Sequence, residues 1–192
     1  MKKVLLVLLC IVFSASVLLA GCGESDNGGE SGISNVSEKS EESSKIVEPG
    51  ETYEFGGTSI VLPKGFTVNE KASPILATPE DYPVHADNIA MTNEKHSKIA
   101  DIEEEALLAL IRETDDDIAE SVTKFDEFAK SNVDGHDVLT VRYSFTYSGL
   151  NMKAIQYSVD TANGIVTYTF TSVTGEYDAD FEMSLGSVKV NG

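Results

Sequence analysis

Residues 138–171 read VLTVRYSFTYSGLNMKAIQYSVDTANGIVTYTFT, three runs in which apolar and polar side chains alternate. Alternation with a period of two is typical of strands that bury one face. Ser148-Gly149 and Asn163-Gly164 separate the runs, and Asn-Gly favours a type I′ turn. We therefore predict three antiparallel strands joined by tight turns. Their alternating aromatic side chains are expected in the core, and they are Tyr143, Phe145, Tyr157, Tyr168 and Phe170.

Shorter β-prone runs precede this meander. Two of them, 52–55 and 58–62, flank Gly56-Gly57 and predict a hairpin. Segment 71–87 contains three prolines and little periodicity, so it is expected to be a loop with one short strand at 74–77. Further strands are expected at 66–68, at 88–92 and at 122–130, with an Asp134-Gly135 turn after the last.

Two segments carry helical periodicity. Apolar residues recur at helical spacing from Ile102 to Ile111, and Asp101 with Glu104 resembles a capping box. Asp115-Asp116-Asp117 is expected to end this helix or to begin a loop. Tyr177, Phe181 and Leu185 lie four residues apart and predict a short helix, followed by a closing strand at 188–190. The expected class is α+β, an antiparallel meander packed with helices in an α/β/α sandwich.

The N-terminus has the pattern of an export signal. Lys2 and Lys3 precede an apolar run over 4–19, which ends in Leu19-Ala20-Gly21-Cys22. Small residues directly before a cysteine resemble the lipobox of bacterial lipoproteins. The resemblance implies that Cys22 is acylated on sulfur, becomes the mature N-terminus and holds the protein at the extracytoplasmic face of the cell membrane.

Two other interpretations of the N-terminus fit its sequence less well. An uncleaved transmembrane helix needs about 20 apolar residues, whereas this run is slightly short and carries Ser14 and Ser16. A soluble secreted protein would need an Ala-x-Ala-like cleavage site, which Leu18-Leu19-Ala20 does not supply. No Lys or Arg follows the run until Lys39, which favours export of everything downstream.

Composition divides the chain into a signal (1–21), a lipidated Cys22 with an acidic Ser/Gly linker (22–50) and one domain (51–192). The linker is too poor in apolar residues to fold by itself. A flexible chain of its length has an r.m.s. span of roughly 30 Å.

The domain is strongly acidic, since 25 acids and 10 bases between 51 and 192 give a formal charge of −15. A nucleic-acid partner requires a basic surface, so it is excluded. Cys10 leaves with the signal and Cys22 carries lipid. The mature chain then has no thiol for catalysis, for a disulfide or for zinc binding.

The order of elements resembles the PsbP-like superfamily over nearly all of 52–190. The resemblance is carried by 57–66 (GTSIVLPKGF), Asp87-Asn88-Ile89, 133–139 (VDGHDVL), 156–159 (QYSV), 165–171 and 181–188. It implies a central antiparallel sheet with helices on both faces and a non-catalytic accessory or partner-binding role. The superfamily has no shared catalytic residues to carry over to this chain.

No motif in the domain specifies a reaction, so no catalytic residue, metal ligand or cofactor is assigned. His85, His96 and His136 lack metal-ligand spacing, and no Gly-x-Ser-x-Gly elbow occurs. The best contact candidates lie in the Pro-bounded segment 80–85, where Tyr82 with Asp81 and His85 is expected to meet a protein partner.

The expected function is a lipid-anchored, non-catalytic interaction or accessory module with an extracytoplasmic protein partner. One alternative is a lipoprotein that binds a small ligand or Ca²⁺, which requires a pocket with convergent polar groups. A second is an extracytoplasmic hydrolase, which requires a cleft with perturbed carboxylates.

Overall fold

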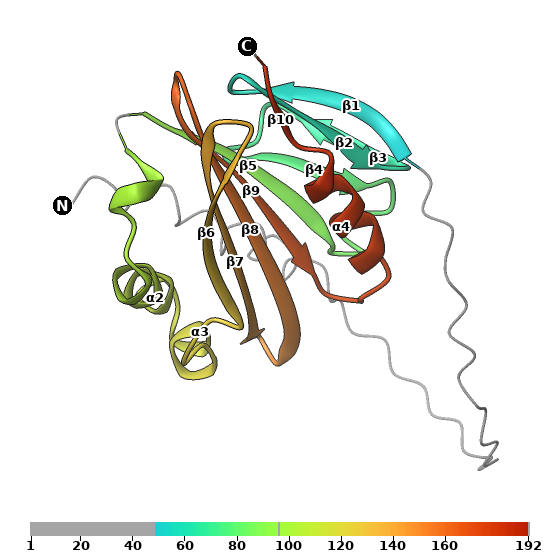
Figure 1. Cartoon of the computed structure of the whole chain (residues 1–192). Coiled ribbons are helices and arrows are strands. Elements are labelled where there is room, and N and C mark those ends of the chain that lie inside the picture. The colour runs from blue at the N-terminus through green and yellow to red at the C-terminus, as the bar shows by residue number, and fades with distance from the viewer. Residues whose placement is uncertain (1–48, 96, 192) are drawn as a thin grey trace, which may run out of the picture.

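The computed structural model describes residues 49–95 and 97–191 (Figure 1). The predicted signal, the lipobox, Cys22 and nearly all of the linker lie outside these residues, as does His96. The elements in chain order are β1 (Pro49–Phe55), β2 (Thr58–Pro63), β3 (Phe66–Asn69), β4 (Ile75–Pro79), β5 (Asn88–Glu94), a 3-10 turn (Ile99–Asp101), α2 (Glu104–Arg112), α3 (Asp116–Ser121), β6 (Glu127–Val133), β7 (His136–Tyr147), β8 (Leu150–Thr161), β9 (Gly164–Ser172), α4 (Asp178–Gly186) and β10 (Lys189–Val190).

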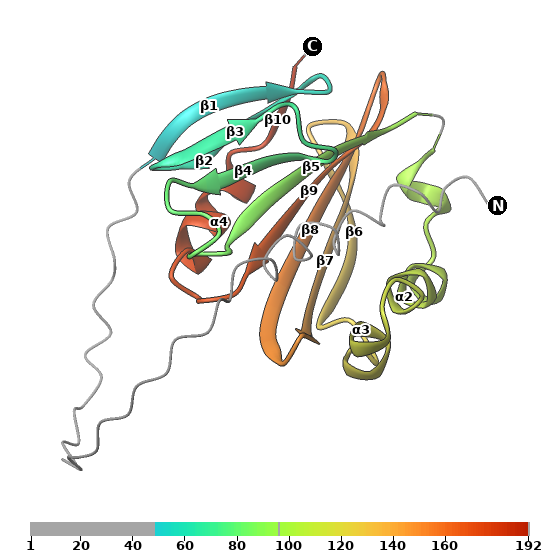
Figure 2. The ribbon, with the colours of Figure 1, turned by 180° about the vertical axis from the view of Figure 1, so that it is seen from behind.

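A seven-stranded antiparallel sheet forms the centre of the domain, in the order β3-β4-β5-β9-β8-β7-β6 (Figure 2). The predicted meander is confirmed as β7, β8 and β9. Central strand β9 is buried along almost its whole length. Its partner β5 comes from 70 residues earlier in the chain, so long-range pairing completes the sheet.

One face of this sheet packs against α4 and a second, three-stranded sheet of β1, β2 and β10 (Figure 1). The apolar cluster between them contains Ile60, Ile89, Tyr168, Phe170 and Phe181. The Gly56-Gly57 hairpin is confirmed as the β1-β2 turn, and β10 pairs with β2. The last residues of the domain therefore close a sheet that its first residues begin.

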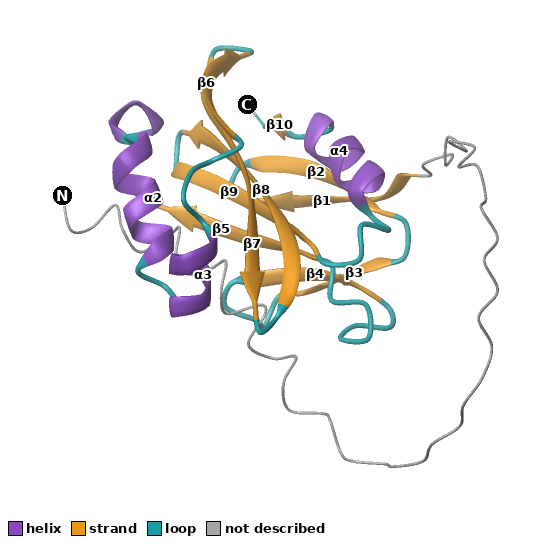
Figure 3. Cartoon of the chain, turned by 90° about the horizontal axis from the view of Figure 1, so that it is seen from below, coloured by secondary structure: helices purple, strands orange, loops and turns teal. Residues whose placement is uncertain are grey.

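The opposite face packs against α2 and α3, and Figure 3 shows the large sheet between these helices and α4. Leu107 and Ile111 of α2 and Ile118 of α3 lie in one apolar cluster with Val141 and Tyr143 of β7. The α/β/α sandwich is thus confirmed. Tyr157 differs from the prediction because it is only half-buried, on the part of the α4 face that the helix leaves open.

The predicted capping box on Asp101 is wrong. Asp101 ends the 3-10 turn, Ile102 is buried in an extended conformation, and Glu103 is the N-cap of α2 without a side-chain hydrogen bond. Burial of Ile102 keeps the chain extended, so the helix begins only after it.

The Asp115-Asp116-Asp117 segment begins a helix that the sequence analysis did not predict. The Asp117 amide donates to Asp115 Oδ1 at 2.9 Å, so Asp115 caps α3, and two acids occupy the favourable first turn. Because α3 extends to Ser121, β6 begins at Glu127 rather than at the predicted residue 122.

The β8-β9 turn also differs from the prediction. Asn163 lacks the positive φ that a type I′ turn requires, and Thr161 pairs with Gly164 around Ala162-Asn163. Gly164 has φ 121°, and a Cβ there would lie 2.0 Å from the Glu94 carbonyl oxygen. This close approach to the end of β5 explains why glycine occupies the position.

Candidate functional site

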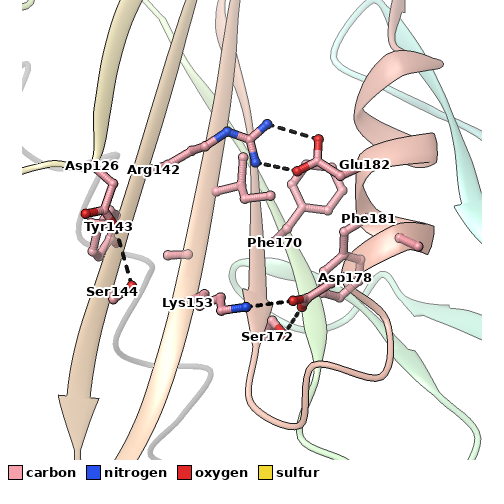
Figure 4. A pocket seen from close by; sticks show the side chains of 13 residues that line it. Asp126, Arg142, Tyr143, Ser144, Lys153, Phe170, Ser172, Asp178, Phe181 and Glu182 are labelled. Carbon is pink, nitrogen blue, oxygen red and sulfur yellow. Dashed lines mark hydrogen bonds and ion pairs between the residues drawn. The ribbon is translucent and has the colours of Figure 1, made fainter. Parts of the chain in front are cut away.

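A cavity of about 470 Å³ lies between α4 and the β7-β8 hairpin, on the α4 face of the large sheet (Figure 4). Its size falls within the range of small-molecule sites. Its lining comes from β7, β8, β9, α4 and the residue before β6, and consists of Asp126, Arg142, Tyr143, Ser144, Lys153, Ala154, Ile155, Phe170, Ser172, Asp178, Ala179, Phe181 and Glu182.

Strand register builds the floor of this cavity. Arg142 pairs with Ile155 across β7-β8, and Ile155 pairs with Phe170 across β8-β9, so the three side chains form one row. The adjacent row is Ser144, Lys153 and Ser172. Phe181 of α4 contacts Phe170 with ring centroids 5.4 Å apart, which closes the apolar end of the floor.

An ion pair between Arg142 and Glu182 joins the sheet to α4 at one side of the cavity (Figure 4). Arg142 donates to both carboxylate oxygens of Glu182, at 3.0 Å for the Nη2–Oε2 pair, and its Nε donates to Glu127 at 2.9 Å. The hydrogen bond to Glu182 raises the pKa of Arg142 above its ordinary value, and burial opposes this shift. Its charge is therefore neutralised by two carboxylates.

A second ion pair joins the sheet to α4 at the other side. Lys153 Nζ donates to Asp178 Oδ2 at 2.8 Å, and the Ser172 hydroxyl donates to the other Asp178 oxygen. Burial raises the pKa of Asp178, but the hydrogen bonds from Lys153 and Ser172 lower it below its ordinary value. Both cations that line the cavity are thus already paired.

Asp126 differs from the other lining acids. It is exposed, and among the described residues its carboxylate takes part in a single hydrogen bond, accepted from Ser144 Oγ at 3.4 Å. Within residues 49–95 and 97–191, no Lys, Arg or His forms an ion pair with it. Asp126 is therefore an anionic group at the cavity that is available to a ligand.

The predicted contact residues lie on a different surface, the β4-β5 loop (residues 80–87). The structure brings His85 and Asp81 together, with Nδ1 hydrogen-bonded to Oδ2, while Nε2 lies 3.7 Å from Glu176. Tyr82 precedes a cis peptide bond to Pro83 and is partly buried. Val84, which the sequence analysis did not single out, is 83% exposed.

Asp87 fixes the end of this loop to the body of the domain. Its carboxylate is fully buried and accepts hydrogen bonds from the Val173 amide at 3.1 Å and the Thr174 hydroxyl at 2.9 Å. The loop therefore presents Val84 from a base that is held in place by the segment before α4.

The His85 contacts predict a raised pKa. The hydrogen bond that His85 donates to Asp81, together with the Asp81 charge, raises the pKa of His85 above its ordinary value of 6.5. Desolvation lowers this pKa, and the charges of Glu176 and Asp87 raise it further. The protonated form then stabilises the loop below about pH 6.5, and this contribution is lost as the pH rises through the raised pKa. We expect NMR titration to give His85 a pKa above 6.5, and Asp81→Asn to lower it.

Asp101→Asn is the matched control for this titration, because it removes an equally exposed carboxylate outside the β4-β5 loop. It should leave the His85 titration unchanged. A His85 pKa that does not respond to Asp81→Asn would contradict the contact.

Among the described residues, no group of three or more His, Cys, Asp or Glu side chains is placed so that it could hold a metal ion. His136 lies apart from His85, with its Nδ1 hydrogen-bonded to the Asp160 carbonyl at 3.0 Å. Within residues 49–95 and 97–191, no helix is both long enough and apolar enough to cross a membrane.

The residues of the cavity were missed by the sequence analysis, although two signals point to them. Asp178 and Glu182 lie four residues apart on the predicted C-terminal helix, so they share a face. Arg142 and Lys153 are the only bases in the meander, and both alternate onto the same face of the sheet.

The large sheet, its flanking helices and the cavity beside α4 define an α+β domain, and solved structures of similar fold are known. No protein-family model matches the chain, and no curated protein matches it in sequence. The chain is similar to the solution structure of cyanobacterial PsbP (CyanoP) from Synechocystis sp. PCC 6803, with TM-score 0.54 and 14% identity, over 79% of this chain and 98% of that chain. This likeness confirms the predicted PsbP-like fold.

Two other solved structures are more distant. One is LpqN, involved in cell envelope biogenesis of Mycobacterium tuberculosis, with TM-score 0.45 and 10% identity over 78% of this chain and 88% of that one. The other is a protein from Bacteroides thetaiotaomicron VPI-5482, with TM-score 0.46 and 14% identity over 74% of this chain and 49% of that one.

Proposed function

We propose that this protein is a lipid-anchored, non-catalytic accessory module that binds a protein partner at the extracytoplasmic face of a bacterial cell membrane. The lipobox-like Leu19-Ala20-Gly21-Cys22 supports the anchor. The PsbP-like fold, shared with CyanoP, is compatible with an accessory role.

The main support for the proposed partner contact is an exposed apolar side chain in the β4-β5 loop. An apolar side chain that is 83% exposed, Val84, follows the cis Tyr82-Pro83 unit and is flanked by charged Asp81 and His85. An apolar group with a polar rim is the arrangement found at protein interfaces. The buried Asp87 contacts hold this arrangement before any partner arrives, which lowers the entropic cost of binding.

Site-specific crosslinking in cells tests the proposal. A photoreactive amino acid at position 84 is expected to capture a recurrent partner, identified by mass spectrometry. Tyr82→Ala in the same chain should lower the yield by about fivefold or more, as loss of one significant contact residue does.

The matched control places the same photoreactive group at Val133, which is 46% exposed at the β6-β7 turn. It should not capture that partner. Equal capture from both positions, or capture that Tyr82→Ala leaves unchanged, would show that the loop is not the contact surface.

A further inference from the structure

We propose that the cavity between α4 and the β7-β8 hairpin is a binding site for a primary amine with an apolar body. The apolar part lies against half-buried Ile155 and exposed Ala179, and the ammonium group meets Asp126. This site uses no residue of the β4-β5 loop and does not depend on the proposed partner contact.

The floor accounts for the apolar part of the ligand. Half-buried Ile155 is the apolar side chain of the floor that a ligand can reach, since Phe170 and Phe181 are 0% and 1% exposed. Apolar walls with a few placed polar groups are typical of small-molecule sites. A ring or short alkyl chain fits the volume of about 470 Å³.

The charged side chains that line the cavity favour an amine as the ligand. Arg142 is neutralised by Glu182 and Glu127, and Lys153 by Asp178, so neither base attracts an anion without breaking an existing pair. Asp126 is the lining acid without such a pair among the described residues. The surrounding domain carries −15 from its 25 acids and 10 bases, which raises the local concentration of cations and repels anions.

The two ion pairs also define the shape of the entrance. Both run from the sheet to α4, at Arg142–Glu182 and at Lys153–Asp178, so they lie at two sides of the cavity mouth (Figure 4). Ala179 of α4 also lines the cavity, and its small side chain is exposed. A larger side chain at position 179 would close the mouth without entering the core.

Calorimetric titration of the full chain, purified in a non-ionic detergent, tests the proposal with three probes of one size. They are 4-phenylbutylamine, 4-phenylbutan-1-ol and 4-phenylbutanoate. We expect the amine to bind most tightly and the carboxylate not to bind. Asp126→Asn should weaken amine binding by about two- to fivefold, as for one exposed ion pair, and leave the alcohol unaffected.

Ala179→Leu should abolish binding of both the amine and the alcohol. Asp101→Asn and Ala106→Leu make the same changes at exposed positions away from the cavity and should change neither affinity. Thermal unfolding of each variant shows that the fold is intact.

Three results would overturn the proposal. Failure of the amine to bind at millimolar concentration removes the site. Equal affinity for amine and alcohol removes the role of Asp126. Amine binding that survives Ala179→Leu places the binding elsewhere. Loss of partner capture at position 84 would contradict only the proposed partner contact of the β4-β5 loop. The two proposals are therefore tested independently.

Discussion

Phe181→Ala is expected to lower the free energy of unfolding by about 3–5 kcal/mol, the usual cost of removing a buried aromatic side chain. Phe181 is 1% exposed and is the main apolar side chain that α4 inserts into the core. Its ring lies 5.4 Å from Phe170 and 6.0 Å from Phe66 between centroids, so it joins the helix to both β9 and β3. Urea or thermal denaturation measures the loss.

Two variants control for this result. Phe181→Leu keeps most of the apolar volume and should cost less than Phe181→Ala. Val84→Ala removes an exposed side chain and should change stability by no more than about 0.5 kcal/mol. If Phe181→Ala were as mild as Val84→Ala, α4 could not be packed on the sheet as described.

The position of α4 affects both the stability of the domain and the shape of the cavity. Helix residues Asp178 and Glu182 pair with strand residues, and Phe181 lies between them on the same side of the helix. The apolar contact places the helix, and the ion pairs then lie at its solvent-facing edge. Exposed pairs of this kind contribute little to stability, so we interpret them as shaping the cavity mouth rather than as holding the helix.

The meander could be predicted because its information is local. Alternation fixes which side chains share a face, and a tight turn fixes which residues pair. The Ser148-Gly149 turn pairs Tyr147 with Leu150, and this register places Arg142 beside Ile155. The part of the cavity floor that β7 and β8 form could therefore be predicted from one turn and from the alternation of side chains.

The register between β8 and β9 could not be predicted from the local turn sequence. A two-residue Asn163-Gly164 turn would pair Ala162 with Ile165, whereas Thr161 pairs with Gly164. The deciding contact is the Glu94 carbonyl, which comes from a distant part of the chain. Helix α4 reaches the sheet in the same non-local way, so the cavity between them could not be assembled from sequence spacing.

The predictions of where the helices begin failed for a different physical reason. Asp101 and Asp115 both precede apolar periodicity and acidic residues, so both satisfy a capping rule. Only Asp115 caps a helix, because Ile102 is buried in an extended conformation and postpones α2. Tertiary packing of one isoleucine overrides the local signal.

The proposed membrane attachment depends on Cys22, and the energetics of acyl chains predict how strong it should be. Burial of each methylene contributes about 0.8 kcal/mol, and one chain binds a membrane only marginally, whereas two bind it stably. A diacylglyceryl group on the Cys22 sulfur supplies two chains. The acidic domain itself should not associate with anionic lipid, so attachment should depend on this one residue.

Cys22→Ala is expected to abolish incorporation of an alkyne-labelled fatty acid and to leave residues 1–21 uncleaved, since lipid transfer precedes removal of a lipoprotein signal. Cys10→Ala removes the other cysteine and should retain the label, because Cys10 lies inside the apolar run of the signal. Intact mass of the wild-type chain should begin at Cys22 with a diacylglyceryl adduct. Label that persists in Cys22→Ala, or an unlabelled wild type that begins elsewhere, would show that the lipobox-like sequence is an ordinary export signal.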